Sequence, residues 1–153
     1  MTNFIGDHPC KLDGKGRILF PAALKKQLGE GMDRFVVKKD LFEKCLVLYT
    51  TDEWERQNQI IRNQVNPFNQ EHNRFLRGFH RGTAELLLDG SNRLLIPKRL
   101  LDEAGIGKDV VLAGQDSKIE VWDKERYDSM ADNEQEFAQL AQKIMQHSKN
   151  EEA

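Results

Sequence analysis

Short apolar runs separated by polar turns recur along the chain and predict small strands. Four such runs are rich in β-branched, aromatic and leucine side chains, which suit a pleated sheet, and they occupy residues 35–37, 45–49, 110–112 and 118–122. Two further apolar stretches, residues 18–20 and 94–96, follow Asp-Gly turns and predict the second strand of a hairpin. The pattern therefore indicates a mainly β chain with helices between its strands, in the α+β class.

Proline and glycine mark two short helices at equivalent places. We expect these helices to start at Pro21 and Pro97, because proline suits the first helical position, where its missing N–H would be unpaired anyway. Gly29 and Gly105 are expected to end them.

Four further helices are also predicted. Thr50 and Glu53 have the spacing of a capping box, and Asp123 is expected to open the corresponding helix of the second half. Asn66 and Pro67 are expected to open a connecting helix, and a final amphipathic helix follows near the end of the chain.

Two of these helices carry an apolar stripe at helical spacing. In the connecting helix the stripe consists of Phe68, Phe75, Leu76 and Phe79, bordered by His72, Arg74, Arg77, His80 and Arg81. In the final helix it consists of Phe137, Leu140, Ala141, Ile144 and Met145. Core packing and contact with another subunit both explain such stripes, and we expect one of these helices to meet another subunit.

The chain is a tandem repeat. The stretch LDGKGRILFP at residues 12–21 returns in altered form as LDGSNRLLIP at residues 88–97. Six pairs lie at a constant offset of 76 residues: Gly6 and Gly82, Asp13 and Asp89, Arg17 and Arg93, Pro21 and Pro97, Leu24 and Leu100, Gly29 and Gly105. The offset then shortens to 73 residues, so that LVLY at 46–49 aligns with IEVW at 119–122 and Trp54 with Tyr127.

Neither unit has strands long enough to form a stable sheet alone, because an isolated hairpin is marginal in water. We therefore expect the strands of both units to interleave into one compact barrel with pseudo-two-fold symmetry. The predicted organisation is a first unit at residues 1–65, a connecting helix at 66–78, a second unit at 79–128, and a C-terminal amphipathic helix with an acidic tail at 129–153.

The first Asp-Gly turn carries a cationic tip. Asp13 and Gly14 are a strong hairpin signal, since turns of this kind use the positive φ that glycine adopts readily. Lys15 and Arg17 offer a point charge and a planar fork that suit phosphate oxygens or a base edge, and Gly16 allows close backbone approach. A purely structural role, with an ion pair between Asp13 and Arg17 and glycines serving only the turn, is the alternative.

The charge is uneven although the net charge is only −2. Residues 11–39 contain eight basic and three acidic side chains, whereas residues 126–153 contain three basic and six acidic ones. This asymmetry suits an anionic partner for the first half, and an ordinary uneven surface explains it equally well.

Motif searches point away from an enzyme. The four histidines, His8, His72, His80 and His147, are scattered, and the chain has no nucleophile elbow or phosphate loop. We expect no catalytic residue, no metal and no cofactor. Cys10 and Cys45 lack metal-binding spacing and are expected to be reduced thiols. No membrane-spanning or signal segment is recognisable, so we expect a cytoplasmic protein.

The two turn motifs, together with LVLY leading to Trp54, VLAGQ at residues 111–115 and IEVWD at 119–123, resemble the MraZ family over residues 1–128. The resemblance implies two tandem SpoVT/AbrB-like units in a swapped-hairpin, double-split β-barrel with peripheral helices. It also implies a transcriptional regulator of the bacterial division and cell-wall gene cluster. Such a regulator acts as a ring-shaped homo-oligomer on short direct repeats in double-stranded DNA upstream of its own operon, and is nucleoid-associated.

On this hypothesis Arg17 contacts guanine, Lys15 contacts a phosphate, and Arg93 is a second DNA contact or a structural partner of Asp89. The residues expected to brace the turns are Asp13, Gly14, Gly16, Asp89 and Gly90. The second turn departs from the first, because Ser91 replaces Lys15 and Asn92 replaces Gly16. Asparagine tolerates the left-handed conformation, so the turn should persist with one cation fewer.

Two other classes of function are open at this point. One is an antitoxin-like ring in which the basic turn binds an acidic protein, and the other is a hydrolase that uses Asp13 or Asp89.

Overall fold

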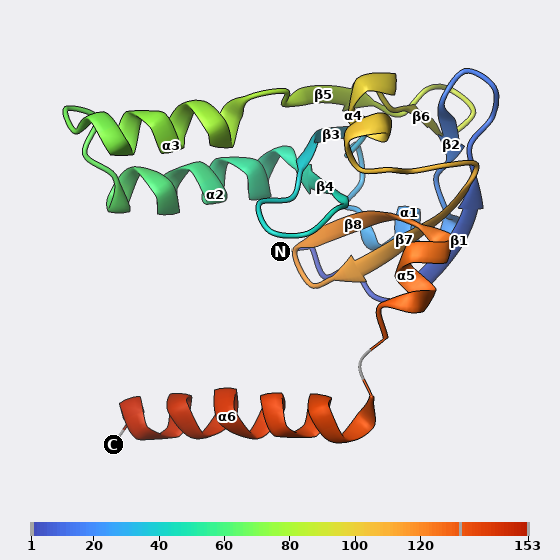
Figure 1. Ribbon diagram of the computed structural model, residues 1–153. Helices are drawn as coiled ribbons and strands as arrows, with labels where there is room; N and C mark the ends of the chain where they lie inside the picture. Colours follow the sequence, from blue (N-terminus) through green and yellow to red (C-terminus); the bar gives the residue numbers. More distant parts are fainter. Residues whose placement is uncertain (1, 132, 153) are drawn as a thin grey trace.

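Two antiparallel sheets form the body of the protein. The computed structural model describes residues 2–131 and 133–152, with side chains described as far as residue 146. Six strands form one sheet, in the order β1-β7-β8-β4-β3-β5, and two form a small ribbon, β2-β6 (Figure 1). The strands are β1 (Asp7–Lys11), β2 (Arg17–Leu19), β3 (Arg34–Lys39), β4 (Leu46–Thr50), β5 (Ala84–Leu87), β6 (Arg93–Leu95), β7 (Asp109–Gln115) and β8 (Lys118–Asp123).

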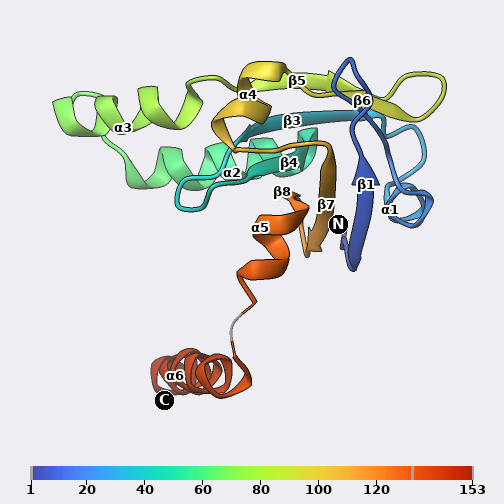
Figure 2. The ribbon, with the colours of Figure 1, turned by 45° about the vertical axis from the view of Figure 1, so that its right-hand side comes forward.

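Helices connect and flank these strands. The helices are α1 (Ala22–Gln27), α2 (Thr51–Gln64), α3 (Gln70–His80), α4 (Lys98–Glu103), α5 (Lys124–Ser129) and α6 (Glu134–Glu152). In both ribbon views α2 and α3 run side by side and project from the sheet, while α6 stands apart from the body (Figures 1 and 2). Within the described residues, no helix is both long and apolar enough to cross a membrane. The architecture is mixed α+β, as the apolar pattern predicts.

The two repeat units are interleaved in the large sheet. Strand β1 of the first unit pairs with β7 of the second, and β5 of the second pairs with β3 of the first. Replacing each strand by its counterpart in the other unit turns the order β1-β7-β8-β4-β3-β5 into its own reverse, so the pairing pattern has two-fold symmetry. The expectation that the strands of the two units interleave is confirmed.

One apolar core serves both units. A single cluster of buried side chains includes Phe4, Ile18 and Phe35 from the first half and Leu94 and Ile119 from the second. Each of these five side chains is at most 1% exposed. Burial of a large apolar side chain stabilises the fold by about 1.5–3 kcal/mol, and here side chains of both units contribute to the same buried cluster.

The starts and ends of the short helices differ in detail from the sequence prediction. Pro21 and Pro97 are not the first helical residues but the residues before them, with extended ψ angles of 135° and 133°. Gly105 does end α4, with a φ of +63° and its N–H donating to the carbonyl of Asp102. Gly29 does not end α1, which stops at Gln27 because Leu28 is already extended.

Helix α2 begins where its cap predicts, and α3 begins later than expected. The hydroxyl of Thr50 accepts a hydrogen bond from the N–H of Glu53 at 3.2 Å, although the Glu53 carboxylate binds Arg56 instead of completing the capping box. Asn69, not Asn66, caps α3. Phe68 therefore precedes the helix and is 95% exposed, so its assignment to the apolar stripe was wrong.

Equivalent aromatic pairs attach the helices that follow β4 and β8. Tyr49 and Trp54 have ring centroids 5.8 Å apart, and their counterparts Trp122 and Tyr127 have centroids 6.0 Å apart. Trp54 also stacks on Phe79 of α3, with centroids 5.7 Å apart and rings parallel within 1°. This contact explains why part of the stripe of α3 packs against α2.

The apolar stripe of α6 remains uncovered in the monomer. Phe137, Leu140, Ile144 and Met145 are between 47% and 69% exposed. The acidic tail expected after this stripe lies outside the described side chains.

Candidate nucleic-acid interface

Asp13 organises the first turn by accepting hydrogen bonds on both carboxylate oxygens. Its Oδ1 accepts from the backbone N–H groups of Lys15 and Arg17, both at 2.9 Å. Its Oδ2 accepts from Nε of Arg17 at 2.7 Å. Backbone bonds between Asp13 and Arg17, and between Gly16 and Asp13, close the hairpin. The carboxylate thus fixes the loop backbone and the direction of the guanidinium together.

The second turn repeats this arrangement with different side chains. Oδ1 of Asp89 accepts from the N–H groups of Ser91 at 2.8 Å and Arg93 at 2.9 Å. Oδ2 of Asp89 accepts from Nε of Arg93 at 3.1 Å. Replacing lysine by serine at the tip therefore leaves the geometry of the turn unchanged, and removes only a charge.

The left-handed residue in each turn is the one directly before the arginine. Gly16 has a φ of +85° and Asn92 a φ of +60°, which confirms that asparagine supports the second turn. Gly14 and Gly90 do not adopt positive φ, so the expectation that the Asp-Gly dipeptide itself needs that conformation was wrong. A left-handed residue at the end of a three-residue loop accommodates the strand twist instead.

The two turns are joined through the ribbon formed by β2 and β6. The carbonyl of Gly16 accepts from the N–H of Ile96 at 3.0 Å, and the carbonyl of Asn92 accepts from the N–H of Phe20 at 2.8 Å. A methyl group on Gly16 would lie 3.2 Å from the carbonyl oxygen of Ile96. The left-handed residue of each turn therefore also hydrogen-bonds to the segment that follows the opposite strand of the ribbon.

One face of this ribbon is exposed and carries both arginines. Arg17 pairs with Leu95 and Arg93 pairs with Leu19, so these four side chains share a face. Leu19 and Leu95 are 64% and 55% exposed, whereas the intervening residues Ile18 and Leu94 are 1% exposed. The α carbons of Arg17 and Arg93 are diagonal neighbours, which are about 7–8 Å apart in an antiparallel pair.

Sequence reasoning did not assign Leu19 and Leu95 to the site. The alternation of exposed and buried positions along residues 17–19 and 93–95 was a usable signal, since alternate side chains point to opposite faces of a strand.

The turn carboxylates are strongly held in their charged form. The backbone N–H of Arg17, followed by the Arg17 side chain and the N–H of Lys15, lowers the pKa of Asp13 to about 2. The backbone N–H groups of Arg93 and Ser91, together with the Arg93 side chain, lower the pKa of Asp89. Carboxylates held in this state are poor proton donors near neutral pH, which argues against a role for Asp13 or Asp89 as the general acid of a hydrolase.

Each arginine still has donors to offer. Among the described residues, the side chains of Arg17 and Arg93 bind Asp13 and Asp89 only through Nε, so the two terminal nitrogens of each guanidinium make no contact with these carboxylates. The side chains of Arg17 and Arg93 are 29% and 36% exposed. An oriented guanidinium with an open edge is suited to bidentate contact with a phosphate or a guanine. The first turn also has an exposed lysine, Lys15, at its tip, where the second turn has Ser91.

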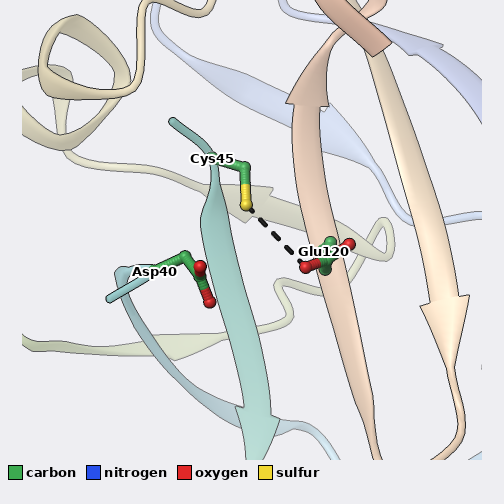
Figure 3. Close-up of side chains that lie close together, drawn as sticks. All are labelled: Asp40, Cys45 and Glu120. Carbon is green, nitrogen blue, oxygen red and sulfur yellow. Dashed lines mark hydrogen bonds between the residues drawn. The ribbon is translucent and has the colours of Figure 1, made fainter. Parts of the chain in front are cut away.

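A second polar cluster lies away from the turns. The side chains of Asp40, Cys45 and Glu120 approach one another (Figure 3). Each offers one atom that could bind a metal ion, and these three atoms lie within 4.8 Å of one another. The thiol of Cys45 donates to Oε2 of Glu120 at 3.9 Å, and Oδ2 of Asp40 accepts from the backbone N–H groups of Phe42 and Glu43. Burial, with the nearby carboxylates, raises the pKa of the Cys45 thiol. A protonated thiol and an engaged carboxylate make this cluster a packed structural group, and sequence spacing did not reveal it.

Comparison with known proteins identifies what these features belong to. The family model of the MraZ protein, described as antitoxin-like, matches the chain twice, at residues 3–78 and 79–148. The chain is 42% identical to the transcriptional regulator MraZ of Christiangramia forsetii, over 95% of this chain and 94% of that protein. It is 39% identical to that of Flavobacterium psychrophilum, over 99% and 98%, and 35% identical to that of Acetivibrio thermocellus, over 92% and 96%.

The class of protein follows from the repeated unit and these relatives together. The chain is a transcriptional regulator built from two tandem units, and not an enzyme. It belongs to the MraZ family.

Proposed function

We propose that the exposed face of the β2-β6 ribbon binds double-stranded DNA in a sequence-specific way. The observation that carries this proposal is the pair of equivalent turns in which an aspartate holds an arginine through Nε and leaves its terminal nitrogens open. Such preorientation reduces the side-chain entropy lost on binding. A regulator of transcription needs a surface of this kind.

Arg17 and Arg93 lie close enough to contact the same stretch of duplex. A separation of about 7–8 Å corresponds to roughly two base-pair steps of 3.4 Å. Arg17 reads guanine through its terminal nitrogens, and Lys15 contacts a backbone phosphate. Arg93 contributes a second contact from the turn that lacks the lysine. Leu19 and Leu95 occupy the other diagonal of the same face, where they can contact thymine methyl groups or sugars.

We further propose that the protein works as a ring of identical subunits on short direct repeats upstream of its own operon, within the division and cell-wall gene cluster. The uncovered stripe of α6 supports an assembly, because an exposed apolar stripe favours contact with another chain. The reciprocal strand pairing supports a swapped-hairpin, double-split barrel. In this barrel the first unit comprises residues 1–65 and the second unit residues 79–128. The protein is then cytoplasmic and associated with the nucleoid.

A gel-shift titration tests DNA binding directly. The full-length protein is compared on a duplex carrying the region upstream of its gene and on a scrambled duplex of equal length. Arg17→Ala and Arg93→Ala each remove a base contact and should weaken selective binding by roughly tenfold or more. Lys15→Ala should weaken binding to both duplexes and reduce the log–log salt slope by about one.

Arg62→Ala is the matched control, because Arg62 is exposed on α2, far in sequence from both turns, and pairs only at the surface with Glu55. It removes the same charge and should leave selective binding intact. Equal loss in Arg62→Ala and Arg17→Ala, or equal affinity of the wild type for both duplexes, would contradict the proposal. Loss in Arg93→Ala alone would reverse the assignment of the two turns.

A protein partner is the second candidate function, because the exposed side chains of Leu19 and Leu95 share the ribbon face with the two arginines. Co-purification with a protein that competes for the ribbon face, without selective DNA binding, would favour this antitoxin-like role.

A further inference from the structure

A separate basic pocket lies between β3, the end of α3 and the start of α4. Its volume is about 310 Å³. Four cationic side chains and two carboxylates line it, namely Lys38, Lys39, Arg81, Arg99, Asp40 and Glu103. None of these residues belongs to either turn.

Lys38 is the unusual member of the pocket. The residue is only 4% exposed, and it forms none of the ion pairs found among the described residues. Its Nζ lies 3.9 Å from the centre of the Phe79 ring, which is itself stacked on Trp54. The ring stabilises the positive charge from one side but accepts no hydrogen bond of ordinary strength from the ammonium's three N–H groups. A recessed cation is thus held in a fixed place with donors to offer.

The surrounding charges leave the pocket positive. The Asp40 carboxylate is occupied by the N–H groups of Phe42 and Glu43. Arg81 and Arg99 are exposed, and neither takes part in an ion pair within the described part of the chain. Gly82 allows the Arg99 guanidinium to approach, because a methyl group at Gly82 would lie 2.9 Å from its Nη1. Lys38 and two arginines therefore face a small space with one unoccupied carboxylate, that of Glu103. The ammonium of Lys39 already donates to the backbone carbonyls of Asp40 and Glu43, both at 3.4 Å.

We propose that this pocket binds a small phosphate-bearing molecule. Arginine forks and lysine ammonium groups donate to phosphate oxygens, and the volume lies at the lower end of the range for small-molecule sites, about 300–1,000 Å³. The recessed position of Lys38 favours a small ligand that enters the pocket over a duplex that lies across the surface. This site is independent of the proposed DNA contacts, although α4 follows β6 directly and links Arg99 to the second turn.

The protonation of Lys38 provides a second signature of binding. Burial lowers the pKa of Lys38 to about 8, with Lys39 and Lys118 lowering it further and Asp40 opposing them. Arg81, Arg99 and Glu103 also face the pocket. A bound anion favours the charged ammonium, so binding near pH 8 should take up protons, and this uptake should fade at more acidic pH as Lys38 becomes fully protonated.

Isothermal titration calorimetry of the full-length protein with inorganic pyrophosphate and inorganic phosphate, at constant ionic strength in chloride, tests the site. We expect saturable binding of one pyrophosphate per chain. Lys38→Met, which keeps an unbranched chain over Phe79, should weaken it about tenfold or more. Arg99→Met, a change at an exposed residue that should not affect folding, should weaken it similarly. Lys98→Met, exposed on the same helix but outside the pocket, should not.

The proposal would be overturned if neither pyrophosphate nor phosphate bound saturably. Equal weakening in Lys98→Met and Arg99→Met would also overturn it, because it would indicate general attraction of anions. Duplex DNA that displaces pyrophosphate and loses affinity in Lys38→Met would assign the pocket to a DNA phosphate instead. Pyrophosphate binding by a protein that fails the gel-shift test would separate this inference from the proposed function, since only the latter would then fail.

Discussion

Asp13 and Asp89 show how one residue type can determine a local structure. Each carboxylate accepts hydrogen bonds from two backbone N–H groups that the turn would otherwise leave to solvent, and each orients one arginine. The ion pair and the DNA contact, which compete as explanations of the sequence, are compatible in the structure. The aspartate uses Nε of the arginine, so the pairing that stabilises the turn also directs the terminal nitrogens outward.

The low pKa of Asp13 makes the first turn resistant to acid. A carboxyl whose pKa is about 2 in the folded protein, against 3.8 ordinarily, contributes to folding above its ordinary pKa and loses that contribution as the pH falls toward about 2. The carboxyl carbon resonance of Asp13 should therefore titrate near pH 2. The deficit in melting temperature of Asp13→Asn relative to wild type should shrink over the same range.

Asp102→Asn is the control for this prediction, because Asp102 is exposed on α4 and lies outside both turns. An Asp13 resonance that titrates near 3.8, or an equal pH-dependent deficit in Asp102→Asn, would show that the turn hydrogen bonds do not hold the charge.

At the scale of elements, the hairpin turns and the β2-β6 ribbon depend on one left-handed residue per unit. Gly16 occupies this position in the first unit, with a φ of +85° and the carbonyl of Ile96 close to where a side chain would begin. Asn92 occupies it in the second. The remaining glycine of the first turn, Gly14, has neither constraint, since nothing lies within 4 Å of its missing side chain.

Gly16→Ala and Gly14→Ala should therefore differ in stability although they are two residues apart. Gly16→Ala should lower the free energy of unfolding by about 1 kcal/mol or more, because alanine is strained at positive φ and crowds Ile96. Gly14→Ala should change it by less than about 0.5 kcal/mol. Urea denaturation of both variants measures the difference, and similar values for the two would contradict the role assigned to the left-handed position.

At the scale of the whole molecule, the two units share both sheets and one core, while α6 remains outside them. Four apolar side chains of its stripe, Phe137, Leu140, Ile144 and Met145, are between 47% and 69% exposed in the monomer. If this stripe holds subunits together, assembly brings several weak ribbon faces to repeated DNA sites, and multivalency raises affinity by about 10²–10⁴.

Ile144→Glu places a charge within the stripe and should reduce the oligomer without unfolding the body, since Ile144 is 58% exposed. Light scattering coupled to gel filtration measures the mass. In the gel shift, the affinity that Ile144→Glu loses relative to wild type should be greater on a duplex with repeated sites than on a duplex with a single site. Gln139→Glu adds the same charge about 140° around the helix and should change neither. An unchanged mass for Ile144→Glu would exclude α6 from the interface.

Much of this protein could be predicted from the amino-acid sequence, because much of its information is local. Apolar runs identified the strands β3, β4, β7 and β8, Thr50 marked the start of α2, and the 76-residue offset related the two turns. Each of these signals depends on neighbouring residues, through side-chain alternation, capping hydrogen bonds or turn chemistry. The prediction that Asn92 tolerates the left-handed conformation was correct for the same reason.

What required the tertiary structure depends on residues distant in sequence. The sheet order that interleaves the units, the shared face of Arg17 and Arg93, and the basic pocket around Lys38 all arise from pairing across the repeat. Local pattern also misplaced the start of α3 and the position of Phe68, because only the packing of Phe79 on Trp54 selects which apolar residues are covered. Sequence determined the turns and their chemistry, and three-dimensional packing decided which surfaces those turns share, since burial is a property of the whole fold.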